Sequence, residues 1–136
     1  MIRTLSLIST ILLSACSIEA TDKDMIVHFE QNRNAFQELV GPKSDCLTGN
    51  KPGPVCLKFM KQLSVFSVGN EPFIKGAVSI DFKSFETENK GYLYSKSEYV
   101  KPLYENLDKM PSGLNPYQKG YKKISKNWYI FYEYLN

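Results

Sequence analysis

The chain is 136 residues long, and 43% of its residues are hydrophobic and 13% aromatic. This length usually makes one domain, and this much apolar surface excludes an intrinsically disordered chain. The formal net charge of +3 is too small to indicate nucleic-acid or acidic-substrate binding. We therefore expect one domain over residues 16–136, preceded by a leader over residues 1–15.

The leader has the features of a bacterial export signal. Arg3 stands ahead of an apolar stretch over residues 5–13, which is too short to span a bilayer by itself. The stretch ends in the sequence LSAC, whose last residue is Cys16, and this sequence resembles the lipobox of bacterial lipoproteins. That resemblance implies cleavage before Cys16, attachment of a diacylglyceryl group to its sulfur and acylation of its new amino group.

Lipidation of Cys16 would anchor the protein to a membrane and leave the domain in the aqueous phase. Because each buried methylene contributes roughly 0.8 kcal/mol, two or three acyl chains give stable anchoring. In enterobacterial lipoproteins an aspartate after the cysteine resembles an inner-membrane retention signal, and this chain has Ser17 there. The resemblance therefore implies an outer-membrane lipoprotein facing the periplasm, with a tether over residues 16–21. The alternatives are an ordinary secretory signal with an incidental cysteine, and a retained membrane helix.

Two helices are expected next. Apolar residues recur at steps of three, four and seven over residues 21–40, which predicts one amphipathic helix. Thr21 or Asp22 can cap its start, and Gly41 followed by Pro42 ends it. A second, short helix is expected after Pro54. The residues that share one face of it are Cys56, Phe59, Met60 and Leu63.

With Cys16 consumed by lipid, the remaining cysteines are an even pair, Cys46 and Cys56. An exported chain meets an oxidising compartment, so we predict a disulfide that fixes the start of the second helix. The turn-rich segment over residues 47–55 can bring the two cysteines together. A redox or metal pair is the alternative, but the spacing is neither C-x-x-C nor a zinc pattern. No metal or other cofactor is expected.

The pattern changes to strands after residue 64. Short β-branched or alternating runs over residues 65–68 and 77–82 predict two strands. A polar loop over residues 86–90 leads into a third strand over residues 91–94. Spaced apolar residues over 100–107 then suggest a further short helix, with Pro102 in its first turn.

A hairpin is expected at the C-terminus. Residues 120–124 turn at 125–127 into residues 128–134, which form the strongest strand pattern in the chain. Both faces of this last strand carry apolar groups, which favours an interior position. The predicted fold is therefore α+β, with helices over one face of an antiparallel sheet of four to five strands.

Several segments together resemble short lipoproteins of Gram-negative bacteria. These segments are the lipobox, the first helix, KGYLYS at residues 90–95, LYENLD at 103–108 and NWYIFYE at 127–133. The likeness spans most of the chain after the leader, and only the closing strand is a specific motif. It implies a localisation and this order of elements, and it brings no activity with it.

The sequence predicts no enzymatic activity and no catalytic residue. Asp24 and His28 are four residues apart on one helix and could form a carboxylate–imidazole pair, but no nucleophile accompanies them. The simpler interpretation is a salt bridge or side-chain pair on the surface of one helix. Glu86 and Glu88 could be read as paired carboxylates, but a solvated loop is the commoner outcome for such charges.

Lysines interleaved with aromatic residues offer the most plausible binding surface. The candidate binding residues are Tyr92, Tyr94, Tyr121 and Trp128. Rings beside cations can stack on sugars, so peptidoglycan or another envelope protein is the expected partner, and nucleic acid is not. The competing interpretation is that alternate rings fill the core. We therefore predict an anchored, non-catalytic binding module; a structural envelope lipoprotein without a ligand, or a periplasmic inhibitor or immunity protein, are the alternatives.

Overall fold

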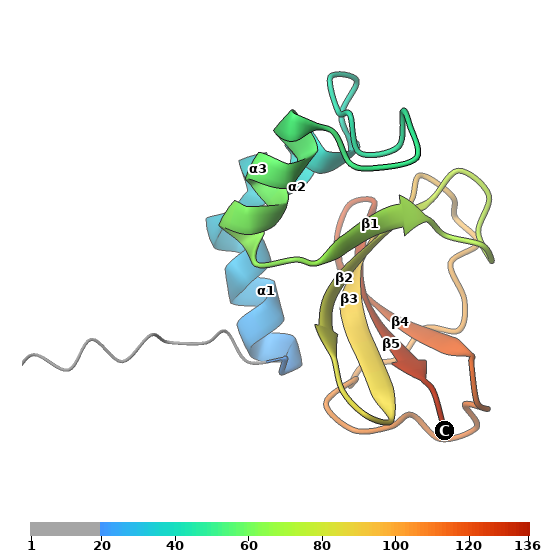
Figure 1. Cartoon of the computed structure of the whole chain (residues 1–136). Helices are drawn as coiled ribbons and strands as arrows, with labels where there is room; N and C mark the ends of the chain where they lie inside the picture. Colours follow the sequence, from blue (N-terminus) through green and yellow to red (C-terminus); the bar gives the residue numbers. More distant parts are fainter. Residues whose placement is uncertain (1–19) are drawn as a thin grey trace, which may run out of the picture.

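Residues 20–136 are described by a computed structural model, in which three helices precede five strands (Figure 1). The helices are α1 (Asp22–Gln31), α2 (Arg33–Val40) and α3 (Pro54–Leu63). The strands are β1 (Ser67–Asn70), β2 (Val78–Ser84), β3 (Glu88–Tyr94), β4 (Lys119–Ser125) and β5 (Trp128–Tyr134). This order confirms the predicted α+β class. Within residues 20–136, no helix is long and apolar enough to cross a membrane.

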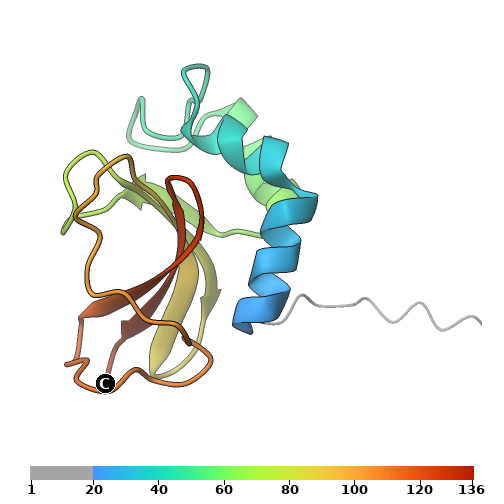
Figure 2. The same cartoon turned by 180° about the vertical axis from the view of Figure 1, so that it is seen from behind.

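The strands pair into one antiparallel sheet in the order β1-β2-β3-β5-β4. The strand predicted as interior is interior, because β5 lies between β3 and β4. The three helices lie on one side of the sheet, as the front and back views show (Figures 1 and 2). Its other face is covered by connecting segments around a smaller apolar cluster that includes Leu93, Tyr121 and Phe131.

Aromatic rings form the centre of the core between the helices and the sheet. The rings of Phe36 and Tyr92 have centroids 4.6 Å apart, and those of Phe29 and Trp128 are 5.1 Å apart. All four side chains are buried. Such pairs contribute about 0.5–1.5 kcal/mol each beyond the burial of their area. They hold α1 and α2 against β3 and β5.

The single helix predicted over residues 21–40 is interrupted at Asn32, and this prediction was wrong in that respect. Thr21 caps α1 as expected, since its Oγ1 accepts a hydrogen bond from the Asp24 amide at 3.2 Å. At the break, the Asn32 side-chain amide donates to the His28 carbonyl at 2.9 Å. An asparagine side chain that bonds a nearby backbone carbonyl in this way competes with the helical hydrogen bonds.

The further short helix predicted over residues 100–107 is not formed. The segment instead runs alongside β4: the Tyr104 amide donates to the Tyr121 carbonyl at 2.8 Å, and the Tyr121 amide to the Pro102 carbonyl at 3.0 Å. Backbone groups used in this way cannot form helical hydrogen bonds. Leu103, expected on the buried helix face, is exposed, whereas Val100 and Leu107 are buried as expected.

Strand boundaries also differ from the prediction, by one or two residues in the first, second and fourth strands and by more in the third. The first strand lies at Ser67–Asn70, two residues after the β-branched run begins. The third begins at Glu88, because the polar residues 88–90 pair with β5 and only a short connection remains. The side chain of Lys90 is consequently buried in the interior.

The predicted disulfide between Cys46 and Cys56 is present, with Cα atoms 5.1 Å apart. It joins the 41–53 connection to the first turn of α3. Asp45 reinforces this join, since its carboxylate accepts the backbone amide of Cys56 at 2.6 Å and that of Val55 at 3.2 Å. A carboxylate at a helix N-terminus satisfies free amides and complements the helix dipole.

Replacing both cysteines by serine is expected to lower the free energy of unfolding by about 2 to 3 kcal/mol, because the crosslink closes a loop that the unfolded chain would otherwise explore. Urea unfolding monitored by Trp128 fluorescence measures the change. The wild-type chain under reducing conditions is the control and should match the double variant. An unchanged midpoint in either case would contradict the stabilising role.

A buried ionic cluster fixes the start of α1 to the sheet. The residues of this Asp22 cluster are Ala20, Asp22, Lys90, Leu107, Asp108 and Lys122. The Lys90 ammonium donates to the Ala20 carbonyl at 2.5 Å and lies 3.5 Å from the Asp22 carboxylate. The same carboxylate accepts the Leu107 amide at 2.8 Å and lies 3.4 Å from the Lys122 ammonium. Helix, sheet and the 95–118 connection therefore meet at one carboxylate.

Candidate binding groove

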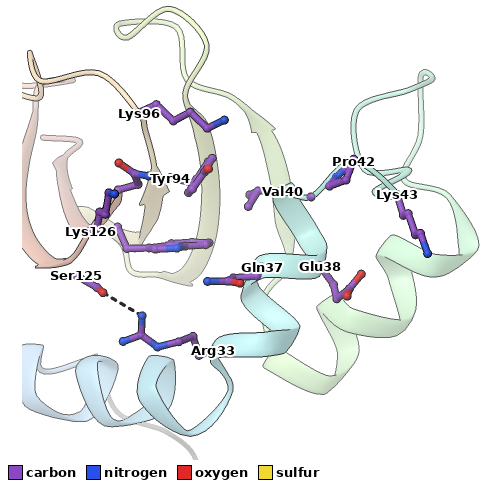
Figure 3. Close-up of a pocket in the computed structure, with 13 residues that line it drawn as sticks. Arg33, Gln37, Glu38, Val40, Pro42, Lys43, Tyr94, Lys96, Ser125 and Lys126 are labelled. Carbon is purple, nitrogen blue, oxygen red and sulfur yellow. Dashed lines mark hydrogen bonds between the residues drawn. The ribbon is translucent and has the colours of Figure 1, made fainter.

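A groove of about 900 Å³ lies between α2 and the end of the sheet where β4 turns into β5 (Figure 3). We call it the basic groove. Its lining residues are Arg33, Gln37, Glu38, Val40, Gly41, Pro42, Lys43, Tyr94, Lys96, Ser125, Lys126, Asn127 and Trp128. A volume of this size is near the upper end of the ~300–1,000 Å³ typical of ligand pockets.

Three elements bring these residues together. Arg33 and Gln37 are one turn apart on α2 and reach toward the sheet (Figure 3). A two-residue turn at Lys126 and Asn127 joins β4 to β5, and Asn127 has the left-handed conformation such turns need, with φ of 64°. The Ser95 amide donates to the Asn127 carbonyl at 2.9 Å, which fixes the end of β3, and hence Lys96, beside this turn.

The electrostatic character of the groove is positive. Lys96 and Lys126 are exposed, and they take part in none of the ion pairs among residues 20–136. The Arg33 guanidinium donates to Ser125 Oγ at 3.0 Å and pairs with Glu30 at 2.8 Å. Among the lining residues Glu38 is the one carboxylate, and Figure 3 shows it at the margin, away from Ser125 and Tyr94.

The floor of the groove is an edge of the aromatic core. The Tyr94 ring packs on the Trp128 ring, with centroids 5.1 Å apart and planes at 54°. Trp128 is itself buried against Phe29 and Phe36. The floor is therefore held rigidly, while the cations above it are on the surface.

The four predicted binding residues do not form one exposed sheet surface. Tyr92 and Tyr121 are buried on opposite faces of the sheet, in the main and the smaller apolar clusters. The Tyr92 hydroxyl donates to the Met25 carbonyl at 3.0 Å, and burial raises the pKa values of both tyrosines. Only Tyr94 and Trp128 reach the groove, and of these Tyr94 is the more exposed.

Asp24 and His28, considered from the sequence as a carboxylate–imidazole pair, are not hydrogen-bonded to each other. Asp24 accepts a hydrogen bond from the Thr21 hydroxyl at 2.8 Å. His28 is buried, and its Nε2 donates to the Leu63 carbonyl at 2.9 Å while its Nδ1 accepts from Asn32 at 3.3 Å. Both ring nitrogens are therefore used, Nε2 to join α1 to the end of α3 and Nδ1 to hold the break between α1 and α2.

His28 makes the stability of the fold depend on pH. Burial lowers its pKa below the ordinary value of about 6.5; the bond to the Leu63 carbonyl opposes this shift and the Lys83 charge adds to it. The unfolded chain therefore binds a proton at a higher pH than the folded protein. The stability is complete above about pH 6.5 and falls as the pH decreases from there toward the folded pKa.

The His28→Gln variant is expected to lose less stability than the wild-type protein between pH 7.5 and pH 5, because glutamine can donate to the Leu63 carbonyl without titrating. Urea midpoints across this range measure the difference. Asp81, whose pKa is raised by burial, is present in both proteins and cancels from the comparison. Parallel curves for the two proteins would contradict the assignment.

The other residues considered from the sequence are Glu86 and Glu88, as paired carboxylates, and Cys16, as the lipidation site. Glu88 accepts a hydrogen bond from the Tyr132 hydroxyl, and Glu86 lies exposed in the connection between β2 and β3. Cys16, the predicted lipidation site, lies outside the described residues. Within residues 20–136, no group of three or more histidine, cysteine or acidic side chains is placed to hold a metal ion.

Sequence reasoning did not identify Arg33, Gln37 and Lys96 as site residues. Arg33 belongs to the polar side of a predicted helix, and Lys96 follows a predicted strand, so each looks like an ordinary solvated charge. They come together only through the pairing of β3 with β5 and the packing of α2 on that end of the sheet. Among the cations of the groove, only Lys126, within the predicted turn, carried a signal from its neighbouring aromatic residues.

No family model, curated protein or solved structure matches the chain.

Proposed function

We propose that the protein is a lipoprotein of the bacterial envelope, anchored through Cys16, whose domain is a non-catalytic binding module. The basic groove is its contact surface. The observation that carries the proposal is the pair of unpaired lysines, Lys96 and Lys126, beside one concavity. Protein surfaces usually intersperse charges of both signs, so an uncompensated concave cluster favours an anionic partner.

The anchor is tested by expressing the wild-type and Cys16→Ala chains in bacteria and measuring their intact masses. The wild-type chain should lack residues 1–15 and carry diacylglyceryl and acyl groups. The variant should carry no lipid. Equal masses apart from the substitution would contradict lipidation at Cys16.

The contact surface is tested by photo-crosslinking in intact cells. A photoreactive amino acid at Gln37, an exposed groove residue, should give a discrete protein adduct or retain the chain in the detergent-insoluble cell wall. The same probe at Gln62, exposed on α3 outside the groove, is the matched control. A structural role without a ligand predicts the same result at both positions, and an inhibitor or immunity role predicts one protein adduct.

A further inference from the structure

We infer that the basic groove binds peptidoglycan, a glycan whose peptide stems carry carboxylates at intervals. The inference rests on the proposed function, since the domain must be outside the cytoplasm to meet such a polymer. Charge, surface chemistry and the position of the groove support it independently.

Charge favours a polyanion. Lys96 follows β3 and Lys126 lies in the β4–β5 turn, so two unpaired charges lie on separate sides of the concavity (Figure 3). Arg33 on α2 adds a third cation, which Glu30 partly neutralises. A single compact anion would contact one of these sides. A chain with carboxylates at intervals can approach all of them, and its attraction weakens as salt screens the exposed charges.

The surface chemistry of the groove disfavours a protein as its partner. Large hydrophobic side chains are exposed elsewhere among residues 20–136, for example Phe73 and Tyr117, but none of the exposed large hydrophobic residues lines the groove. Protein interfaces usually depend on buried aromatic or aliphatic anchors. The groove instead offers polar side chains beside its cations.

Those polar groups suit sugar hydroxyls. Gln37, Ser125 and Asn127 can donate and accept hydrogen bonds, and the partly exposed Tyr94 ring presents an aromatic surface beside them. Sugars need hydrogen bonds in several directions together with an aromatic face, whereas a phosphate needs mainly positive charge. The mixed lining therefore fits an acidic sugar chain better than a phosphate group.

The groove also lies away from the tethered end of the domain. The described chain begins at the start of α1, whereas the groove lies along α2 and the β4–β5 turn. Residues 22–32 separate the start of α1 from Arg33, the first α2 residue that lines the groove, which is roughly 16 Å along the helical layer. An anchored domain would thus present the groove to the space beyond the membrane surface rather than to the lipid head groups beside its anchor.

Co-sedimentation of the purified full chain, kept in detergent, with peptidoglycan sacculi tests the inference. The wild-type chain should bind, and the double variant Lys96→Glu and Lys126→Glu should bind at least about tenfold more weakly. The matched control is Lys51→Glu with Lys75→Glu, the same change in charge at exposed residues outside the groove, which should bind like wild type. Sacculi with carboxylates converted to neutral amides should not bind.

Soluble competitors distinguish a glycan from charge alone. Polygalacturonate should displace the chain from sacculi at lower charge concentration than inorganic polyphosphate. Equal binding of both charge variants, binding to amidated sacculi, or stronger competition by polyphosphate would overturn the inference. If the chain does not co-sediment with sacculi while the Gln37 probe still captures one protein, the glycan assignment is wrong and the proposal of a binding module is retained. If neither gives a groove-dependent result, both are wrong.

Discussion

Replacing Asp22 by asparagine is expected to lower the free energy of unfolding by about 3 to 5 kcal/mol, the usual cost of breaking a buried ion pair. The buried Lys90 ammonium would keep only the Asp108 carboxylate, which lies 4.0 Å away and is partly exposed. The Lys90 side chain is 3% exposed and that of Asp22 6%, so water cannot replace the lost charge. Asparagine keeps the shape and can still accept the Leu107 amide, which confines the change to the charge. Urea unfolding monitored by Trp128 fluorescence measures it.

A double-mutant cycle separates the ion pair from general damage. In the Lys90→Met background, Asp22→Asn should cost at least about 2 kcal/mol less than in the wild-type background, because no buried ammonium is left behind. Glu30→Gln removes the carboxylate of an exposed pair with Arg33 and should cost about 0.5 kcal/mol or less. Equal costs for Asp22→Asn and Glu30→Gln would show that the Asp22 cluster does not hold the fold.

The second large effect is expected from Gly91→Ala in β3. A Cβ atom at Gly91 would lie 2.2 Å from the Ile80 carbonyl oxygen and 2.6 Å from Cε1 of Phe131. The contact with β2 is to backbone, so it can be relieved only by separating two paired strands. We expect a loss of about 3 kcal/mol or more, since overpacking here adds displaced backbone hydrogen bonds to side-chain strain.

Gly69→Ala is the matched control, because Gly69 is also a strand glycine and a Cβ there would meet nothing within 4 Å. This change should alter stability by about 0.5 kcal/mol or less, or stabilise the protein slightly. The difference between the two variants in one urea series is the measurement. If Gly91→Ala does not fold, its soluble yield and far-ultraviolet circular dichroism are compared with those of Gly69→Ala. Two variants of equal stability would refute the close approach at Gly91.

Much of the fold could be predicted because its signals are local. The turn at Lys126 and Asn127 lies between two runs of strand residues, and the even pair of cysteines encloses a turn-rich segment. The failures have long-range causes. The residues after Val100 pair with β4, a strand that begins at Lys119, so their helical spacing does not decide their conformation.

Most of the candidate site could not be predicted, for the same reason. Lys90 stands in a polar run and looks solvated, yet its position in β3 points its side chain toward the start of α1, where Asp22 neutralises it. Lys96, which has no such partner, looks no different in the sequence. Whether a lysine becomes buried structure or an exposed binding group depends on which element packs above it, and that element is distant in the chain.

The Asp22 cluster also determines how the domain carries mechanical load. Any pull on the segment before residue 20 reaches the domain at Ala20, whose carbonyl is held by Lys90. Lys90 belongs to β3, the middle strand of the five. The force therefore enters the sheet at its centre, where strands on both sides share it, and not at an edge strand that could peel away one hydrogen bond at a time.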